Sequence, residues 1–438
     1  MSGKKIFLAC GVDEALEKRL DLVFSDFDNI CVSFSGGKDS GLLLNAVLEY
    51  KRRHGCGQRI AVFHEDYEAQ YSMTTEYVTR MYEANIDDIE PYWFCVPMTV
   101  NCSVSMHQLS WVPWNPAERD IWVRPLPEQP YVISLEHDNV PDFYRLAMTD
   151  EALYEEFGKW YARTHPGRSI VLLGIRANES LNRYAAITND RKTLYRGQHW
   201  TRQAGENYYV GHPIYDWEVE DVWVANGRRG YDYNRLYDLY YKAGLTLSQM
   251  RVASPYNIWG RATLNLYRVI DPEVWVKVVG RVQGANFAAI YGDTKALGYR
   301  EIKLPKGHTW ESYCKFLLST LPQETRNHYL EKFETSIKFW KEKGGVVSDE
   351  AIAELEACRY PIEKVGPSVR SKHGRTDVRF AEIPDDTDDV KSTIDIPSWK
   401  RMTYCILKND HTCKWMGFGP TKKQSERIKE IIEKYRSL

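Results

Sequence analysis

The chain has 438 residues, of which 43% are hydrophobic and 27% charged, and its formal net charge is −2. This composition and length indicate a folded globular protein of two or three domains, or of one large α/β domain with additions. The near-neutral charge argues against a protein that coats nucleic acid. No apolar run approaches the ~18 residues of a membrane span. Residues 1–10 are too short and polar for a signal peptide, so we expect a cytoplasmic protein with no membrane partner.

In chain order, strand and helix patterns alternate from about residue 29 to residue 175. Apolar runs rich in β-branched residues predict strands, and amphipathic stretches between them predict helices. The expected strands are 30–34, 59–64, 91–96 and 170–175, and the expected helices are 40–53, 72–85 and 151–164. This order predicts an α/β fold with a parallel sheet of about five strands and helices on both faces.

The rest of the chain follows a different pattern. Residues 99–148 are rich in proline and tryptophan and interrupt the alternation, so we expect an ordered insertion there. The predicted domains are an α/β domain over 1–260, a helical extension over 261–363, a linker or mobile loop over 364–397, and a small module over 398–438. That module is expected to contain an aromatic turn at 415–418 and a basic helix from about Thr421.

Nine cysteines are scattered along the chain, with no C-x-x-C pair. In a cytoplasmic protein this predicts buried free thiols. It predicts no iron–sulfur cluster, which needs several clustered cysteines. It also predicts no zinc site, because Cys405, His411 and Cys413 are poorly spaced and lack a fourth ligand.

The most informative stretch is Ser-Gly-Gly-Lys-Asp-Ser at residues 35–40, here called the PP-loop, where a predicted strand gives way to a helix. Two glycines allow a sharp bend, and the helix start presents free N–H groups and a positive dipole end. Ser35 and Ser40 add hydroxyl donors and Lys38 adds a mobile charge. The stretch therefore predicts a phosphate-binding loop.

A second candidate segment is Leu173–Ser180, followed by Arg183. An apolar strand delivers Arg176 at its carboxyl end, where ligands bind in open α/β sheets. Arg176 and Arg183 could form bidentate contacts with phosphate or sulfate oxygens, and Glu179 could orient an arginine or help to hold Mg²⁺. An Arg–Glu ion pair that caps a helix is the structural alternative.

Two further segments remain ambiguous. Residues 212–223 are explained mostly by a helix with a buried stripe, and His212 is expected to be structural. The basic stretch 191–202 could bind an anion, or a nucleic acid with Tyr195 or Trp200 stacking on bases. A solvated charged loop explains it equally well.

Three segments in the correct order, at 35–40, 174–180 and 213–223, resemble the phosphoadenosine phosphosulfate reductase-like proteins, and the PP-loop itself resembles that of the ATP pyrophosphatases. Residues 279–287, 397–401 and 406–410 are similar to a subgroup with an extra C-terminal domain, which includes proteins described as co-regulators of immunoglobulin-binding-protein expression. The resemblance implies an adenine-nucleotide α-hydrolase-like fold and a ParB-like partner protein.

The resemblance also implies a set of site residues. The predicted catalytic residues are Lys38, Asp39, Arg176 and Arg183. The predicted nucleotide-binding residues are Ser33, Ser35, Gly36, Gly37, Lys38, Asp39, Ser40, His64, Asp66, Gly174, Arg176 and Glu179. The predicted ligands of Mg²⁺ are Asp39, Glu65 and Asp66.

We therefore predict an enzyme that binds ATP or another adenine nucleotide with Mg²⁺, cleaves the α–β bond and transfers AMP to an unknown acceptor. The chain lacks the Glu-Cys-Gly-Leu-His motif of the reductases, and Cys413 is its nearest candidate nucleophile. Reduction of phosphoadenosine phosphosulfate in sulfur metabolism stays open as an alternative. So do a non-catalytic nucleotide sensor that acts with a ParB-like protein, and thiolation of tRNA or DNA with a sulfur-carrying partner. Net charge does not favour nucleic acid as a partner.

Overall fold

The structure is a computed structural model of the chain. It describes residues 9–180, 183–184, 187, 192–286, 288, 302, 304–371, 375–391, 396–413 and 416. The predicted basic helix after Thr421, and the predicted aromatic turn apart from Met416, lie outside these residues.

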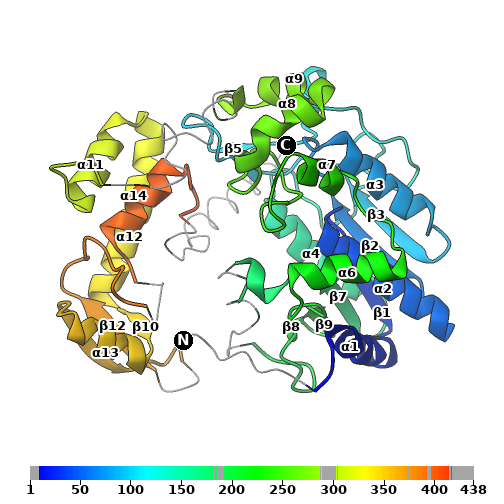
Figure 1. Cartoon of the computed structure of the whole chain (residues 1–438), viewed down its shortest axis with the longest axis horizontal. Coiled ribbons are helices and arrows are strands. Elements are labelled where there is room, and N and C mark those ends of the chain that lie inside the picture. Colours follow the sequence, from blue (N-terminus) through cyan, green and yellow to red (C-terminus); the bar gives the residue numbers. More distant parts are fainter. Residues whose placement is uncertain are drawn as a thin grey trace.

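A seven-stranded sheet forms the centre of the larger part of the molecule (Figure 1). In spatial order its strands are β6 (Val132–Ile133), β3 (Ile89–Phe94), β2 (Ile60–Glu65), β1 (Asn29–Ser33), β7 (Ser169–Leu173), β9 (Tyr208–Gly211) and β8 (Thr201–Gly205). Every neighbouring pair is parallel except β8 and β9. The predicted α/β fold is confirmed, but the sheet is wider than expected and ends in an antiparallel edge strand.

Helices cover both faces of this sheet, as predicted. Ile30 and Val32 of β1 enter one core, together with buried residues of α1 (Val12–Asp26), α2 (Lys38–His54), α3 (Ser72–Glu83) and α6 (Val219–Arg229). Cys31 enters the other core, with α4 (Asp150–Thr164) and α7 (Leu236–Lys242). Because both faces are buried, the middle of β1 (Ile30, Cys31 and Val32) is continuously apolar rather than alternating.

The buried carboxylate of Glu68 helps to hold the insertion in place. The insertion contains β4 (Val100–Asn101), β5 (Ser110–Trp111), the 3₁₀ helix η1 (Pro116–Ile121) and β6. Glu68 accepts the N–H of Trp114 at 2.7 Å, the N–H of Val123 at 2.9 Å and Nε of Arg281 at 2.8 Å. Arg281 ends α9 (Pro272–Arg281), so this carboxylate joins the insertion to a helix far along the chain.

The C-terminal part has its own core, which lies to one side of the sheet in Figure 1. Buried residues come from α11 (Trp310–Thr320), α12 (Gln323–Glu342), α13 (Asp349–Ala357) and α14 (Trp399–Leu407). A three-stranded sheet in the order β10 (Gly345–Val347), β12 (Thr376–Phe380) and β11 (Ile362–Pro367) completes it. The short helices η3 (Gly260–Leu266) and α8 (Tyr267–Ile270) precede α9.

The stretch 364–397, expected as a linker, differs from that expectation. Its described residues include β12 and most of β11, which pair antiparallel. Val378 and Phe380 are buried at alternate positions of β12, because one face of this small sheet packs on the C-terminal core. The domain boundaries themselves stay a prediction.

Side chains of the C-terminal part form hydrogen bonds with main-chain carbonyl groups of the insertion. Thr325 Oγ1 donates to the carbonyl of Met106 at 2.7 Å, and Asn409 Nδ2 to that of Ser103 at 3.3 Å. His411 Nε2 lies 3.2 Å from the carbonyl oxygen of Ser105. The insertion is thus the surface on which the two parts meet.

Two simpler features complete the description. The nine cysteines are all free, and six of them are buried. Among the helices that the structure describes, none is long and apolar enough to cross a membrane.

Candidate anion-binding site

The PP-loop lies where the sheet order changes direction. β1 pairs with β2 on one side and with β7 on the other, so the loop after β1 opens at a topological switch point, the usual ligand site of such sheets. A Cβ on Gly174, just after β7, would lie 2.7 Å from the backbone nitrogen of Ser40 and 2.8 Å from the carbonyl carbon of Asp39. Only glycine therefore allows the end of β7 to approach α2 this closely.

Hydroxyl groups hold the PP-loop in shape. Ser40 Oγ accepts the N–H of Ser35 at 3.2 Å and donates to the carbonyl of Gly37 at 3.2 Å. Gly36 has φ +73°, a left-handed conformation that glycine adopts without strain. Gly37 caps α2 without a side-chain bond, so the amides of Asp39 and Ser40 have no acceptor inside the helix. Free amides at the start of a helix are a common place for an anion to bind.

Tyr237 closes one side of the loop. Its hydroxyl oxygen accepts the N–H of Lys38, the first residue of α2, at 3.0 Å. The ring is buried and packs edge-on against Trp223. One amide of the helix start is therefore already occupied by a fixed phenol.

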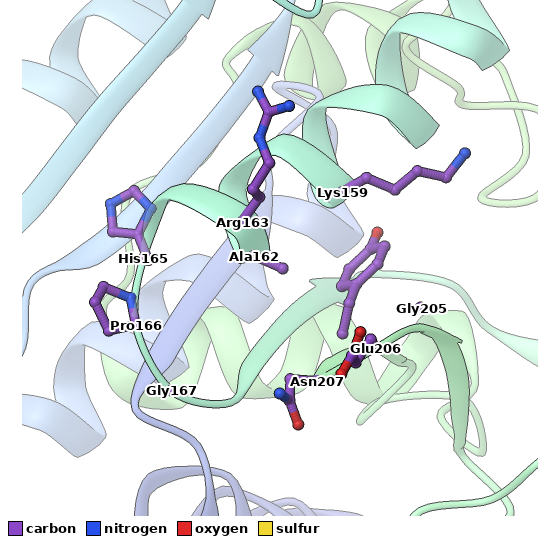
Figure 2. Close-up of a pocket in the computed structure, with 10 residues that line it drawn as sticks. Lys159, Ala162, Arg163, His165, Pro166, Gly167, Gly205, Glu206 and Asn207 are labelled. Carbon is purple, nitrogen blue, oxygen red and sulfur yellow. The ribbon is translucent and has the colours of Figure 1, made fainter.

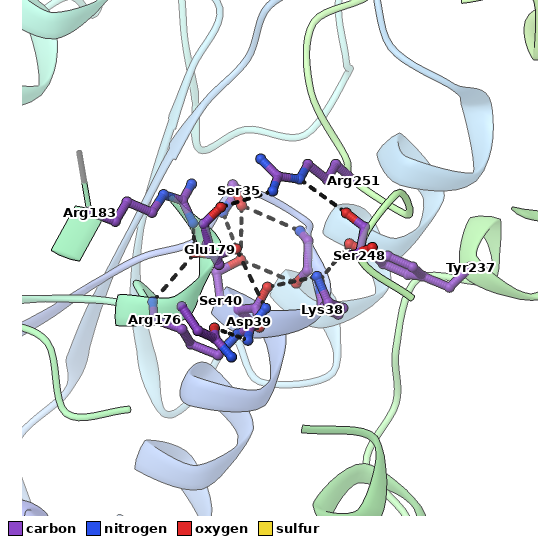
Figure 3. A network of polar contacts seen from close by, with 12 residues as sticks. Ser35, Lys38, Asp39, Ser40, Arg176, Glu179, Arg183, Tyr237, Ser248 and Arg251 are labelled. Carbon is purple, nitrogen blue, oxygen red and sulfur yellow. Dashed lines mark hydrogen bonds and ion pairs between the residues drawn. The ribbon is translucent and has the colours of Figure 1, made fainter. Parts of the chain in front are cut away.

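Ion pairs connect the loop to the segment after β7 (Figure 3). The carboxylate of Asp39 lies 3.0 Å from Lys38 Nζ and 2.6 Å from Arg176 Nε. Arg176 also donates to Asn178 Oδ1 at 2.7 Å. Glu179 pairs with Arg183 and lies 3.7 Å from Arg176. The sequence-distant segments around residues 39 and 176 thus form one network.

Arg251 also belongs to this network, and sequence reasoning missed it. Its guanidinium donates to the backbone carbonyl of Glu179 at 3.1 Å and stacks over the ring of Trp259. No carboxylate of the described residues forms an ion pair with it. No local pattern marks residue 251, because the fold alone brings it to the PP-loop.

The cluster carries more positive than negative charge. Among the described residues, Lys38, Arg176, Arg183 and Arg251 gather around two carboxylates, those of Asp39 and Glu179. Burial lowers the pKa of Lys38, of Arg183 and of Arg251, and the charge of Arg176 lowers all three further. An anion with two or more charges would relieve this repulsion.

The structure brings together most of the predicted nucleotide-binding residues, namely Ser35, Gly36, Gly37, Lys38, Asp39, Ser40, Gly174, Arg176 and Glu179, with Arg183 beside them. Ser33 ends β1 just before the loop. His64 lies apart from the cluster: its Nδ1 is 2.7 Å from the carbonyl oxygen of Phe34, and burial lowers its pKa. It is placed to support the end of β1 as a neutral side chain.

The predicted magnesium ligands are not brought together. Asp66 is buried, pairs with Arg124 and accepts Trp93 Nε1 at 2.8 Å. Glu65 accepts the hydroxyl of Tyr67 at 3.1 Å, and burial raises its pKa. Consecutive residues at a strand end point to opposite faces of a sheet, and Asp39 is already held by Lys38 and Arg176.

Two other predicted features have structural roles. Tyr195 and Trp200 are buried, so neither is available to stack on a base as the basic stretch 191–202 had suggested. His212 is buried as well. Burial, with the nearby charges of Lys192 and Arg202, lowers its pKa to about 4, as suits a neutral structural histidine.

A separate hollow of about 420 Å³ lies between the end of α4 and the turn before β9 (Figure 2). Lys159, Arg163, Glu206 and Asn207 are among the residues that line it. Gly167 and Asn207 precede β7 and β9, so the hollow lies at the amino edge of the sheet. The PP-loop lies at the carboxyl edge, and the hollow is therefore not part of the anion-binding site.

Comparison with known proteins establishes the family. YbdN of Escherichia coli (strain K12) is 33% identical to this chain over 440 residues, which cover 99% of the chain and 97% of YbdN. The chain belongs to the YbdN family. A family model described as "Domain of unknown function (DUF3440)" matches residues 244–427. That segment begins just before Arg251, so the C-terminal family region supplies a cation to the PP-loop.

Solved structures match parts of the chain at low similarity. The phosphoadenylyl-sulfate reductase of Candida auris is 12% identical, covering 58% of this chain and 99% of its own, with a TM-score of 0.27. The FMN adenylyltransferase of Candida glabrata is 12% identical, covering 53% and 63%, with a TM-score of 0.29. The U34-tRNA thiolase NcsA of Methanococcus maripaludis is 10% identical, covering 66% and 84%, with a TM-score of 0.31. Similarity of this degree carries no argument about the reaction.

One prediction about cofactors is wrong. The sequence analysis excluded an iron–sulfur cluster, yet the thiolase structure contains a [4Fe–4S] cluster. Among the described residues, no group of three or more His, Cys, Asp or Glu side chains that could hold a metal ion is present. The buried cysteines are distributed over all three cores.

Proposed function

We propose that YbdN-family proteins of this type bind the phosphates of an adenine nucleotide at the PP-loop, and that this chain is an enzyme that cleaves ATP between the α and β phosphates. One observation carries the proposal: four cationic side chains and the free amides of α2 surround two carboxylates at a topological switch point. A polyanion is the ligand that such a charge excess favours.

Each group has a distinct part in the proposed reaction. The amides of Asp39 and Ser40 and the hydroxyl of Ser35 bind the β and γ phosphates, and Lys38 stabilises the charge of the leaving pyrophosphate. Arg176, oriented by Asp39 and Asn178, contacts the α-phosphate. An acceptor oxygen forms a bond to the α-phosphorus, the bond from this phosphorus to the bridging oxygen breaks, and pyrophosphate leaves with the electron pair.

A pyrophosphate-release assay tests this function. Wild-type protein with ATP in Mg²⁺ buffer, screened against candidate acceptors, should release pyrophosphate and form an AMP adduct. Arg176→Gln should lower the rate at least ~100-fold, because it removes a charge that faces the reacting phosphate. Arg163→Gln, at the opposite edge of the sheet, is the matched control and should match wild type. ATP binding without pyrophosphate release would instead support a nucleotide sensor.

The sulfonucleotide reductase alternative lacks a nucleophile near this site. Cys413 is buried in the C-terminal core with Cys405, whereas the cationic cluster lies at the edge of the large sheet. A role with a ParB-like partner, and the subgroup that suggests it, stay predictions from the family resemblance, as does a cytoplasmic location.

A further inference from the structure

Trp259 is a large aromatic side chain at the protein surface, beside Arg251 of the cationic cluster. It is 50% exposed. The main-chain N–H groups of Trp259 and Gly260 both donate to Asn257 Oδ1, at 2.9 and 2.7 Å. A Cβ on Gly260 would lie 2.1 Å from the carbonyl oxygen of Ser254, so the turn is closed tightly on itself. The indole is thus presented on a fixed backbone.

Arg251 connects this indole to the PP-loop cluster. Its guanidinium carbon lies 4.7 Å from the ring centroid of Trp259, and the same group donates to the carbonyl of Glu179. The side chain of Glu179 pairs with Arg183. A guanidinium covers one face of the ring, and the exposed part of the indole remains accessible to a ligand.

The two side chains offer complementary chemistry. An exposed indole stacks on planar heteroaromatic rings of any identity, and a guanidinium without a carboxylate partner binds an anionic group. Single exposed apolar residues are common and need no explanation of their own. Trp259 differs from such residues because Arg251, which lies over its ring, also belongs to the proposed nucleotide site.

We propose that Arg251 and Trp259 form a second subsite, which binds the acceptor. The acceptor is then a planar heteroaromatic ring that carries an anionic group, as a mononucleotide does, either free or at the end of a single-stranded nucleic acid. This inference rests on the proposed function, since the acceptor must lie beside the phosphates of ATP.

Calorimetry on protein whose PP-loop site is filled tests the subsite at Arg251 and Trp259. The protein is saturated with α,β-methylene ATP and titrated with AMP, with ribose 5-phosphate as an anion without a ring and adenosine as a ring without an anion. We expect AMP to bind with one further equivalent and at least ~10-fold more tightly than either fragment, since stacking and charge act together. A 5′-phosphorylated oligonucleotide that binds more tightly than AMP would identify nucleic acid as the source of the ring; weaker binding would identify a free mononucleotide.

The variants decide whether Trp259 is responsible. Trp259→Ala should weaken AMP at least ~10-fold, and Trp259→Phe should restore most of the affinity because it restores a stacking ring. Tyr241→Ala removes an aromatic side chain that is 73% exposed elsewhere and should change nothing. Absence of a second equivalent, or an unchanged affinity in Trp259→Ala, would overturn the inference. Failure of the ATP analogue to bind at all would instead refute the proposed function.

Discussion

Gly174 shows how one residue can set the geometry of the site. Its hydrogen faces the backbone of α2, where a methyl group would approach three main-chain atoms of Asp39 and Ser40 within 2.7 to 2.9 Å. Backbone atoms cannot rotate aside as the end of a flexible side chain can. The end of β7, which carries Arg176, is therefore fixed at a short distance from the PP-loop.

We expect Gly174→Ala to destabilise the protein by ~1–3 kcal/mol, because β7 and α2 must separate. ATP affinity should fall with it, since Arg176 moves away from Asp39. Urea unfolding and ATP titration measure the two effects. Gly227→Ala is the matched control, as nothing lies within 4 Å of a Cβ there. Equal stability of the two variants would contradict the close approach.

Between residues 29 and 175, the strands and helices outside the insertion could be predicted because their signals are local, whereas α1 and the short elements of the insertion were missed. β1, α2, β2 and β7 each have a continuous apolar or amphipathic run, and the PP-loop motif lies between two of them. Because ligands bind at the carboxyl ends of strands in open α/β sheets, Arg176 was expected near the PP-loop, and its Nε lies 2.6 Å from Asp39. The β8–β9 hairpin was missed, since its strands are short and the preceding basic stretch indicated a loop.

Side-chain roles at strand ends were harder to predict. Glu65 and Asp66 are adjacent in the sequence, but their side chains point to different faces of the sheet. Glu65 accepts a hydrogen bond from Tyr67, and Asp66 pairs with Arg124. Tyr237 and Arg251 reach the site only through long-range packing. A motif identifies the candidate anion-binding loop, whereas the fold decides which distant residues surround it.

The insertion is the element most dependent on a single charge. Glu68 is completely buried and satisfies two main-chain amides and Arg281. Glu68→Gln should lower the free energy of unfolding by ~3–5 kcal/mol, because Arg281 would remain buried with one carboxylate fewer. Urea unfolding measures the loss. Glu118→Gln, which removes the half-exposed partner of Arg281, should cost under ~1 kcal/mol. Similar losses in both variants would count against this account.

The chain as a whole consists of two packed parts that meet at residues 103–106. Contacts from Asn409 and His411 to main-chain carbonyls help to hold them together. The proposed nucleotide site lies entirely in the first part together with the segment up to Trp259, so it should not require this contact.

We therefore expect Asn409→Ala/His411→Ala to unfold in two thermal transitions, with the C-terminal core melting first, while ATP affinity stays within about twofold of wild type, since distant independent sites rarely couple. Differential scanning calorimetry and ATP titration follow the two properties. A single transition at the wild-type temperature would show that these bonds do not hold the parts together. A large loss of ATP affinity would show that the site depends on the C-terminal core.

Calorimetric titration of ATP into wild-type and Lys38→Ala protein tests the central claim most directly. Lys38 is buried beside Asp39 and Tyr237 at the start of α2, where its charge lies in the candidate anion-binding loop. We predict that wild type binds one ATP and that Lys38→Ala binds it at least ~10-fold more weakly while remaining folded, as loss of one charge-assisted bond implies. Equal affinity in the two proteins would contradict the account.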